Sequence, residues 1–302
     1  MWRARLTAPD PTFLLRDRHG RFLGEVEAAT DGRFGFWPLT DLLPRVVAAT
    51  LAVEDRRFRL HPGVDPVAIL RALRDNARKG RRVSGASTLA MQVARMQHPG
   101  PRSYPRKTLE AASALVMTLT HGREAVLRHY LRIVPYGNQI HGISYAARRY
   151  LDKPVQDLSW AETAFLSAIP QSPARMNPFH ASGRRRAVAR GRRILDLLLA
   201  DGLLDASEHE LAVEQIDRLA IPPAGERPRS ALHALLRLER DLEAPEQRAT
   251  LADRLLVRTT LDLGIQDEVS WQVRRAVARW EGEDARNAAA IVLDRRSREV
   301  RA

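Results

Sequence analysis

Amphipathic helical segments follow one another along most of the chain between residues 39 and 219. In each segment the apolar side chains recur at three- and four-residue intervals, which places them on one face of a helix. Proline and glycine interrupt the pattern where helices end. The chain is therefore predicted to be mainly α. The predicted helices are Leu39–Leu60, Val67–Ala77, Leu89–Met96, Arg106–Thr120, Ala125–Val134, Ile143–Leu151, Trp160–Ile169, Arg184–Leu204 and Ala206–Leu219.

Strands are predicted only near the two ends of the chain. Residues Thr12–Glu27 contain two short apolar stretches around His19 and Gly20, a pattern typical of a β-hairpin. A second region with strand character starts at Leu255, passes through a helical segment and ends in a hairpin strand that runs to the last residue. The prolines and glycine of residues 222–228 indicate a break before this region.

The chain is strongly basic, and nearly all of its positive charge comes from arginine. The formal net charge is +13, and of 49 basic residues only Lys79, Lys107 and Lys153 are lysine. Arginine binds phosphate oxygens through paired hydrogen bonds, so the expected partner is anionic: a nucleic acid, a phospholipid surface or a phosphorylated substrate. A nucleic acid is not expected, because no recognition motif accompanies the charge.

Several kinds of site are excluded by the residues alone. The chain has no cysteine, which rules out disulfides and thiolate metal sites. The spacing from Gly80 to Gly85 matches a phosphate-binding P-loop, but Ala86 stands where its lysine is required. No serine lies three residues before a lysine, so the Ser-x-x-Lys nucleophile is absent. The nine scattered histidines predict no zinc site built by the protein.

The stretch from Val53 to Asp65 combines acids, an aromatic residue and a histidine close to a Pro-Gly turn. On a helix, Glu54, Phe58 and His61 would lie on one stripe at positions i, i+4 and i+7. An acid is then held against an aromatic ring with an imidazole one turn away, which makes Glu54 a candidate general base. The alternative is an ordinary helix end with its charges in solvent.

Ser87 and Thr88, with Gln92 one turn on, place hydroxyl and backbone N–H groups at the start of a predicted helix. Such a terminus is a natural pocket for an anion, and Ser87 or Ser84 is its predicted N-cap. The alternative is an ordinary helix cap without a ligand.

Arg106 and Lys107 lie one turn before Glu110 on the following helix, at i, i+4 and i, i+3. Surface salt bridges of little energetic weight are the alternative for this group.

The order of these three groups resembles that of the first three motifs of the family 51 peptidoglycan glycosyltransferases. Two later segments look like the fourth and fifth motifs of that family. The fourth normally reads Tyr-Leu-Asn, and here Arg132 takes the place of the asparagine, which is expected to support local structure. The five segments are Glu54–Gly63, Gly85–Gln92, Arg106–Glu110, Tyr130–Gly137 and Ala161–Pro178.

The end of the chain resembles the opening of the transpeptidase domain of class A penicillin-binding proteins, through Arg258–Asp262, Gln266 and Ile291–Asp294. The chain stops before that domain's serine, so no transpeptidase activity is expected, and we interpret the chain as a truncated bifunctional enzyme. The expected parts are an N-terminal segment with the hairpin (residues 1–44), a glycosyltransferase domain (45–182), a helical linker (183–254) and the truncated start of the transpeptidase domain (255–302).

The resemblance implies a fold and a reaction. The fold is mainly α: a lysozyme-like bilobal glycosyltransferase domain with a short N-terminal β-hairpin and a truncated α+β C-terminal segment. In the reaction, lipid II is polymerised into β-1,4 glycan strands: an acceptor's 4-hydroxyl attacks the anomeric carbon of a lipid-diphosphate donor, with inversion and release of the lipid diphosphate.

Motif by motif, the resemblance also implies which residues act. Glu54 is the expected general base. Glu110 is expected to support the diphosphate directly or through a divalent cation, Mg²⁺ or Mn²⁺, for which the protein alone builds no site. The expected substrate-binding residues are Asp55, Phe58, His61, Ser87, Thr88, Gln92, Arg95, Arg106 and Lys107.

The partners implied are lipid II, the growing glycan strand, a membrane surface and other cell-wall synthesis proteins, with no nucleic acid. The apolar helix at Ala111–Leu119 suits membrane contact, although a buried core helix is the alternative. The expected location is the periplasm or the outer face of the bacterial cytoplasmic membrane. The chain has no apolar run of 18 residues, and residues 1–9 lack a signal-peptide core, so neither an anchor nor an export signal is expected in it.

Two other functions remain as alternatives. A lysozyme-type glycan hydrolase also uses a glutamate in a helical cleft, but it has no diphosphate for the Ser-Thr-Gln and Arg-Lys groups to hold. A non-catalytic cell-wall scaffold fits Arg132 and the truncation, whereas the presence of both Glu54 and Glu110 argues against it.

Overall fold

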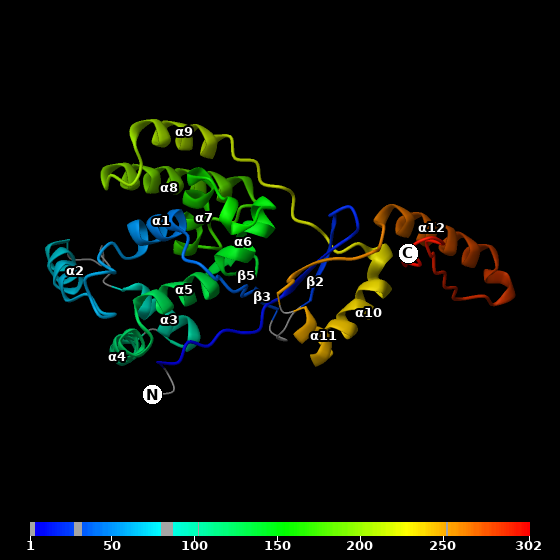
Figure 1. The fold of residues 1–302 in the computed structure, drawn as a ribbon, viewed down its shortest axis with the longest axis horizontal. Helices are drawn as coiled ribbons and strands as arrows, with labels where there is room; N and C mark the ends of the chain where they lie inside the picture. The colour runs from blue at the N-terminus through cyan, green and yellow to red at the C-terminus, as the bar shows by residue number, and fades with distance from the viewer. Residues whose placement is uncertain (1–3, 27–31, 80–86, 102, 252) are drawn as a thin grey trace. The chain divides into compact units, whose positions relative to one another are not determined.

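The computed structural model describes residues 4–26, 32–79, 87–101, 103–251 and 253–302. The P-loop-like segment from Gly80 to Ala86, which includes the possible N-cap Ser84, lies outside these residues. The described residues are mainly helical, which confirms the predicted fold class. Contacts divide the chain into two compact units, which Figure 1 shows: a helical unit (Met1–Asp10 and Arg33–Pro223) and a mixed unit (Pro11–Gly32 and Ala224–Ala302).

The helical unit contains every helix predicted between residues 39 and 219, with ends shifted by a few residues. The largest shift is in the first helix, which was predicted to run from Leu39 to Leu60 and spans only Pro44–Glu54. The helices are α1 (Pro44–Glu54), α2 (Pro66–Lys79), α3 (Leu89–Gln97), α4 (Tyr104–His121), α5 (Arg123–Ile133), α6 (Ile143–Leu151), α7 (Trp160–Ala168), α8 (Ala181–Ala200) and α9 (Ala206–Asp217), with 3-10 turns η2 (Val155–Asp157) and η3 (Ile169–Gln171).

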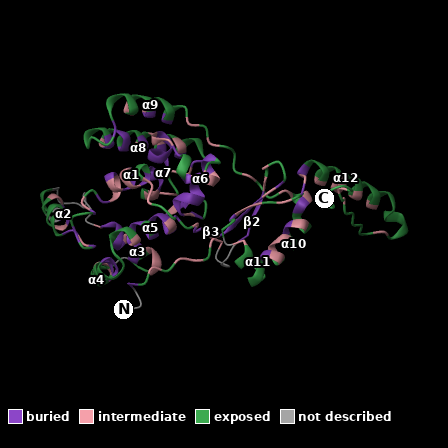
Figure 2. Ribbon diagram, viewed as in Figure 1, coloured by how far each residue is buried: buried purple, intermediate pink, exposed green. Residues whose placement is uncertain are grey.

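Helix α7 is the centre of the core of this unit. All of its residues from Ala161 to Ala168 are buried, and it packs against α1, α8 and α9 (Figures 1 and 2). A Cβ atom at Gly191 of α8 would lie 2.4 Å from Cδ1 of Ile216 on α9, so a larger residue there would have to displace the end of the Ile216 side chain. Because α8 is part of this core, the unit continues beyond residue 182, where we expected a linker to start. The functional domain boundaries stay a prediction.

A small sheet that was not predicted joins distant parts of the helical unit. Its strands are β3 (Phe34–Gly35), β4 (Pro135–Gly137) and β5 (Ile140–His141), in the order β3-β5-β4. Gly35 has φ +111°, and a Cβ atom there would lie 2.1 Å from the His141 carbonyl oxygen. Strands this short carry no periodic signal, so only the long-range pairing reveals them.

The mixed unit holds the predicted N-terminal hairpin. Strand β1 (Phe13–Arg16) pairs antiparallel with β2 (Phe22–Val26), which confirms the hairpin. It also pairs parallel with β6 (Leu256–Arg258), a partner more than 200 residues away. Helix α12 is exposed over most of its length (Figure 2), with only Leu263 buried. The elements are β1 (Phe13–Arg16), β2 (Phe22–Val26), β6 (Leu256–Arg258), α10 (Leu232–Glu243), α11 (Pro245–Thr250), α12 (Leu263–Arg279), η4 (Arg229–Ala231) and η5 (Glu281–Glu283).

Among the described residues, no helix combines the length and the apolar character needed to cross a membrane.

The buried carboxylate of Asp17 holds the hairpin turn together. Its Oδ1 accepts hydrogen bonds from the backbone N–H groups of His19 and Arg21, both at 2.8 Å, and its Oδ2 accepts one from Arg21 Nε at 2.7 Å. The N–H of Leu263 at the start of α12 donates to Oδ2 at 3.4 Å. Burial alone would raise the pKa of Asp17, but these donors outweigh it, and the pKa is lowered from its ordinary value.

At neutral pH, we expect the free energy of unfolding of the Asp17→Asn variant to be about 2 kcal/mol lower than that of the unmodified chain, because the charged acceptor of four hydrogen bonds is lost. Because the folded pKa is depressed, the stabilisation by the carboxylate is complete above its unfolded pKa of about 3.9 and is lost as the pH falls through the lower folded pKa. Urea unfolding of both proteins between pH 6 and pH 2 measures this difference. A difference that stays constant across this range would contradict the account.

Candidate active site

Glu54 is the last residue of α1, and its half-buried carboxylate faces the start of α3. The helix ends there because Asp55 leaves helical geometry, with φ −161° and ψ 73°. Glu54, Phe58 and His61 are therefore not on one helical stripe, and that prediction was wrong. What holds the Glu54 carboxylate is Gln92 of α3, whose Nε2 donates a hydrogen bond to Glu54 Oε2 at 2.9 Å.

The buried carboxylate of Asp55 ties the segment after α1 to α3. Its Oδ2 accepts a hydrogen bond from the backbone N–H of Leu89, the first residue of α3, at 3.0 Å. Its Oδ1 lies 2.9 Å from His61 Nε2. The N–H of Gly63 donates to His61 Nδ1 at 3.2 Å, so Nδ1 is an acceptor and the proton of the neutral ring is on Nε2, facing Asp55.

Phe58 and Gly63 complete this packing. The Phe58 ring meets the His61 ring edge-on, with centroids 6.3 Å apart, and both side chains are buried. Gly63 has φ +111°, and a Cβ atom there would lie 2.5 Å from the Ala114 carbonyl oxygen of α4. The loop can therefore lie against α4 only with glycine at this position.

Thr88, and not Ser87, is the N-cap of α3. Its Oγ1 accepts a hydrogen bond from the N–H of Met91 at 3.2 Å and donates one to the carbonyl oxygen of Gly63 at 2.5 Å. This hydroxyl is thus already engaged in holding the loop on α3, and its predicted contact with substrate stays a prediction. Ser87 lines a pocket of about 220 Å³ together with Glu54, Asp55, Arg57 and Arg71.

The predicted cationic residues are on α3 and α4, which pack against each other. On α4, Arg106 Nε lies 3.6 Å from Glu110 Oε1, and both side chains are largely buried. Lys107 on α4 and Arg95 in the last turn of α3 are exposed. Within the described part of the chain, no hydrogen bond or ion pair joins this group to Glu54, so the site has two separate halves.

The donor set around Glu110 does not amount to a metal site. Its one carboxylate is paired with Arg106, and the described residues contain no group of three or more metal-ligating side chains. The role of a divalent cation between Glu110 and the substrate stays a prediction.

Sequence reasoning missed three residues whose charge or hydroxyl is close enough to Glu54 to interact with it. Tyr130 and Tyr136 are buried, and burial, followed by the negative charge of Glu54, raises the pKa of both phenols far above the ordinary value. Burial lowers the pKa of Arg190 on α8, and the attraction of Glu54 opposes that effect. The tyrosines belong to the segment similar to the fourth motif, which was a usable signal; Arg190 had none.

Arg132 supports the backbone. Its Nε donates a hydrogen bond to the Phe36 carbonyl oxygen at 2.9 Å, and its Nη2 lies 3.4 Å from that of Pro9. This side chain thus joins the end of α5 to two segments near the N-terminus, a structural role of the kind expected for the residue at this position.

We expect the Asp55→Asn variant to lose about 3 kcal/mol of unfolding free energy, because it leaves a buried imidazole and a helix N–H without their charged partner. Urea unfolding measures this loss. The matched control is Asp75→Asn, which removes a surface pair with Arg74 and should change the stability by less than about 0.5 kcal/mol. Equal effects of the two substitutions would contradict the role assigned to Asp55.

Two known proteins are similar to this chain over different shares of its length. Penicillin-binding protein 1C of Escherichia coli is 30% identical over 281 residues, which cover 88% of this chain and 33% of that protein. The biosynthetic peptidoglycan transglycosylase of Rhodospirillum centenum is 38% identical over 169 residues, which cover 55% of this chain and 72% of that protein. This chain thus spans about a third of the length of penicillin-binding protein 1C.

A solved structure and a family profile complete the comparison. The crystal structure of penicillin-binding protein 1A from Haemophilus influenzae has 15% identity and a TM-score of 0.44, over 80% of this chain and 26% of that one. The profile described as Transglycosylase matches residues 19–198, more than half of the chain. Because this profile covers more than half of the chain, and because the chain is 38% identical to a transglycosylase over most of that protein's length, the chain belongs to the transglycosylase family.

Proposed function

We propose that this chain is a peptidoglycan glycosyltransferase that polymerises lipid II into β-1,4 glycan strands. The observation that carries the proposal is the position of Glu54: a half-buried carboxylate at a helix end, oriented by Gln92 at 2.9 Å and bordering a pocket. Membership of the transglycosylase family supports the same conclusion. A carboxylate held in this way can accept a proton from a hydroxyl group brought to the pocket.

The reaction assigns one task to each half of the site. Glu54 accepts the proton of the acceptor 4-hydroxyl while the hydroxyl oxygen forms a bond to the donor's anomeric carbon. The bond from that carbon to the diphosphate oxygen breaks on the opposite side, and the diphosphate leaves with the electron pair. Arg95, Arg106 and Lys107 stabilise the charge that develops on the leaving group. Glu110 orients Arg106 through their ion pair.

Asp55 and His61 contribute by positioning Glu54 and Gln92. They hold the loop after Glu54 against α3, so that Gln92 reaches the Glu54 carboxylate. The buried phenols of Tyr130 and Tyr136 stay neutral beside it, because burial and the Glu54 charge both raise their pKa.

Exposed apolar side chains on α2 and α4 suit contact with the membrane that holds a lipid-linked substrate. Helix α4 buries Ala114 and Met117 but leaves Leu119 70% exposed, so the predicted apolar segment is both a core helix and a surface. Leu70 on α2 is 67% exposed. Apolar side chains of this kind, beside a surplus of arginine, bind anionic lipid surfaces. We therefore propose that the chain acts at the outer face of the cytoplasmic membrane or in the periplasm, with lipid II, the growing strand and other cell-wall synthesis proteins as partners.

Glu54→Gln should reduce polymerisation of lipid II by about 100-fold to 10,000-fold, the usual contribution of a general base, without loss of folding. Gel analysis of glycan strands measures the product, and thermal unfolding checks the fold. Glu214→Gln, on the exposed side of α9 where Glu214 pairs with Arg218, is the matched control and should keep normal activity. Near-normal synthesis by Glu54→Gln would refute the assignment.

The same assay separates polymerase from hydrolase. A lysozyme-type enzyme would shorten preformed glycan and leave lipid II monomer unchanged, whereas the proposed enzyme consumes the monomer.

The double variant Leu70→Ser and Leu119→Ser should bind vesicles of anionic phospholipid roughly tenfold more weakly, since two exposed leucines no longer insert. Co-flotation with the vesicles measures the bound fraction. Leu211→Ser on α9, also exposed, is the control and should bind like the unmodified chain. Equal binding by all three proteins would rule out this surface as the membrane contact.

A further inference from the structure

Residues 4–9, which we call the N-terminal strap, lie against the helical unit but bury little of their own side chains. Only Ala4 is buried, whereas Arg5 and Thr7 are exposed. Figure 1 shows the segment in dark blue, beside α3 and α4. Because the strap gains little from the burial of apolar surface, its position depends on the hydrogen bonds that hold it.

Gln97, the last residue of α3, holds the middle of the strap. Its Nε2 donates hydrogen bonds to the carbonyl oxygens of Arg5 and Thr7, both at 2.9 Å, and lies 2.8 Å from Thr7 Oγ1. Its Oε1 is buried and has no partner among the described residues. Within those residues, the Gln97 side chain therefore hydrogen-bonds only to the strap.

Helices α4 and α5 hold the two ends of the strap. His121, the last residue of α4, places its Nε2 3.0 Å from the carbonyl oxygen of Ala4. At the other end, Arg132 Nη2 of α5 lies 3.4 Å from the carbonyl oxygen of Pro9. The strap is thus bound mainly through its backbone, by side chains from three helices.

His129 of α5 is the buried imidazole next to the middle of the strap. Its ring hydrogen-bonds to the backbone of Thr7, and its Nε2 is buried with no partner in the part of the chain that the structure describes. The charged groups that act on this ring are Arg132 of α5 and His121 of α4, and both oppose a positive charge there. Helix α3 brings only the neutral amide of Gln97 to the same strap residue.

A proton on His129 is therefore strongly disfavoured while the strap is docked. Burial is the largest cause, followed by the charge of Arg132, and together they lower the pKa of His129 from 6.5 to about 4 although the contact with Thr7 opposes them. A released strap would expose the ring nitrogen that Thr7 covers, and the pKa would return toward its ordinary value. The neutral ring thus stabilises the docked strap fully above about pH 6.5, and this contribution is lost as the pH falls toward 4.

We propose that residues 4–9 form an acid-released strap, which is docked on α3, α4 and α5 while His129 is neutral and is displaced when His129 takes up a proton. One proton bound on release changes the ratio of docked to released strap by up to about tenfold per pH unit in this range. Helices α3 and α5 also carry Gln92 and Tyr130, so the strap joins two of the helices that surround Glu54. The proposal does not depend on the reaction assigned to Glu54.

A fluorophore on the strap of the full chain tests this release. Because the chain has no cysteine, Arg5→Cys supplies a single thiol for the label at an exposed position. Fluorescence anisotropy should fall between about pH 6.5 and pH 4, since the label gains rotational freedom, while circular dichroism shows unchanged helical content. A constant anisotropy, or a fall that coincides with loss of the helices, would overturn the proposal.

Two variants of the labelled chain assign the transition to His129 and to the docked strap. His129→Gln keeps a donor for Thr7 but takes up no proton, so the acid transition should be lost. Gln97→Ala removes two hydrogen bonds from the docked strap, so release should occur at a higher pH, by up to about one unit for each tenfold loss of docking. This second variant keeps the proposal testable even where His129→Gln does not fold.

His209→Gln is the matched control, because this histidine of α9 pairs with Asp196 at 2.9 Å, outside the residues that bind the strap. Its transition should lie at the same pH as that of the labelled chain without further substitution. An unchanged transition in His129→Gln, or a Gln97→Ala transition that coincides with the control, shows that the strap is not released by protonation of His129.

Discussion

The buried Asp55 carboxylate is the contact on which the candidate site depends. It joins two segments that are 34 residues apart in sequence, through hydrogen bonds with His61 and with the first N–H of α3. Ionised acceptors bind backbone N–H groups at a helix start strongly, because the helix dipole adds to the hydrogen bond. With α3 held in this way, Gln92 lies one turn further on and reaches Glu54. The position of the proposed base therefore follows from its acidic neighbour.

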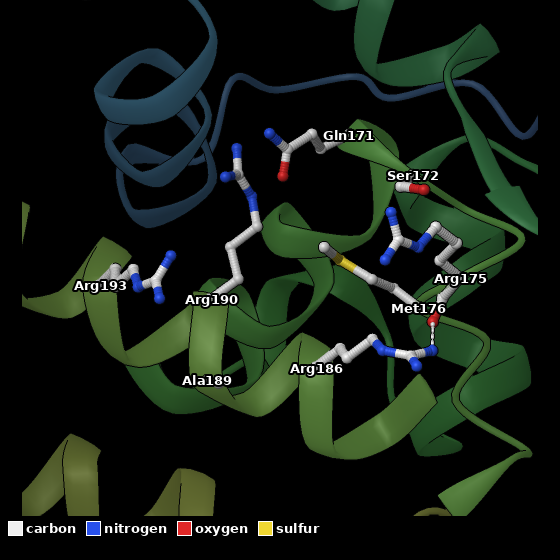
Figure 3. Close-up of a pocket in the computed structure, with 8 residues that line it drawn as sticks. All are labelled: Gln171, Ser172, Arg175, Met176, Arg186, Ala189, Arg190 and Arg193. Carbon is white, nitrogen blue, oxygen red and sulfur yellow. Dashed lines mark hydrogen bonds between the residues drawn. The ribbon is translucent and has the colours of Figure 1, made fainter. Parts of the chain in front are cut away.

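Positive charge is distributed in two arrangements that differ in how they are balanced. Arg106 has an acidic partner in Glu110, which keeps it in place beside the exposed Lys107. A second, larger pocket of about 460 Å³, next to η3 and α8 (Figure 3), is lined by four other arginines, Arg175, Arg186, Arg190 and Arg193. These four form no ion pair among the described residues, although the negative charge of Glu54 attracts Arg190. A protein tolerates uncompensated guanidinium groups where a ligand supplies the counter-charge. The arginine-rich composition thus reflects specific clusters as well as a generally basic surface.

Helices were predictable from the sequence because their signal is local. The spacing of apolar residues located α6 at Ile143–Leu151 without error and placed the other helices of the helical unit within a few residues, apart from α1. Helix α1 was predicted to be too long because the apolar pattern continues through Phe58. The helix ends before Asp55, whose side chain accepts a hydrogen bond from Leu89, a residue far along the chain. The sheet β3-β5-β4 and the pairing of β1 with β6 were missed, since strands of two to four residues depend on partners far along the chain.

The sequence alone was enough to establish the helical content and the N-terminal hairpin, because both depend on residues close together in the chain. It also established the surplus of arginine and the order of the motifs around Glu54, because composition and order need no three-dimensional information. Only the tertiary structure decided which acid is oriented by Gln92 and which is bonded to His61, that Thr88 caps α3, and that Arg190 and Arg175 line one pocket. These pairings depend on distances between helices, and such distances are set by side-chain packing in the core around α7.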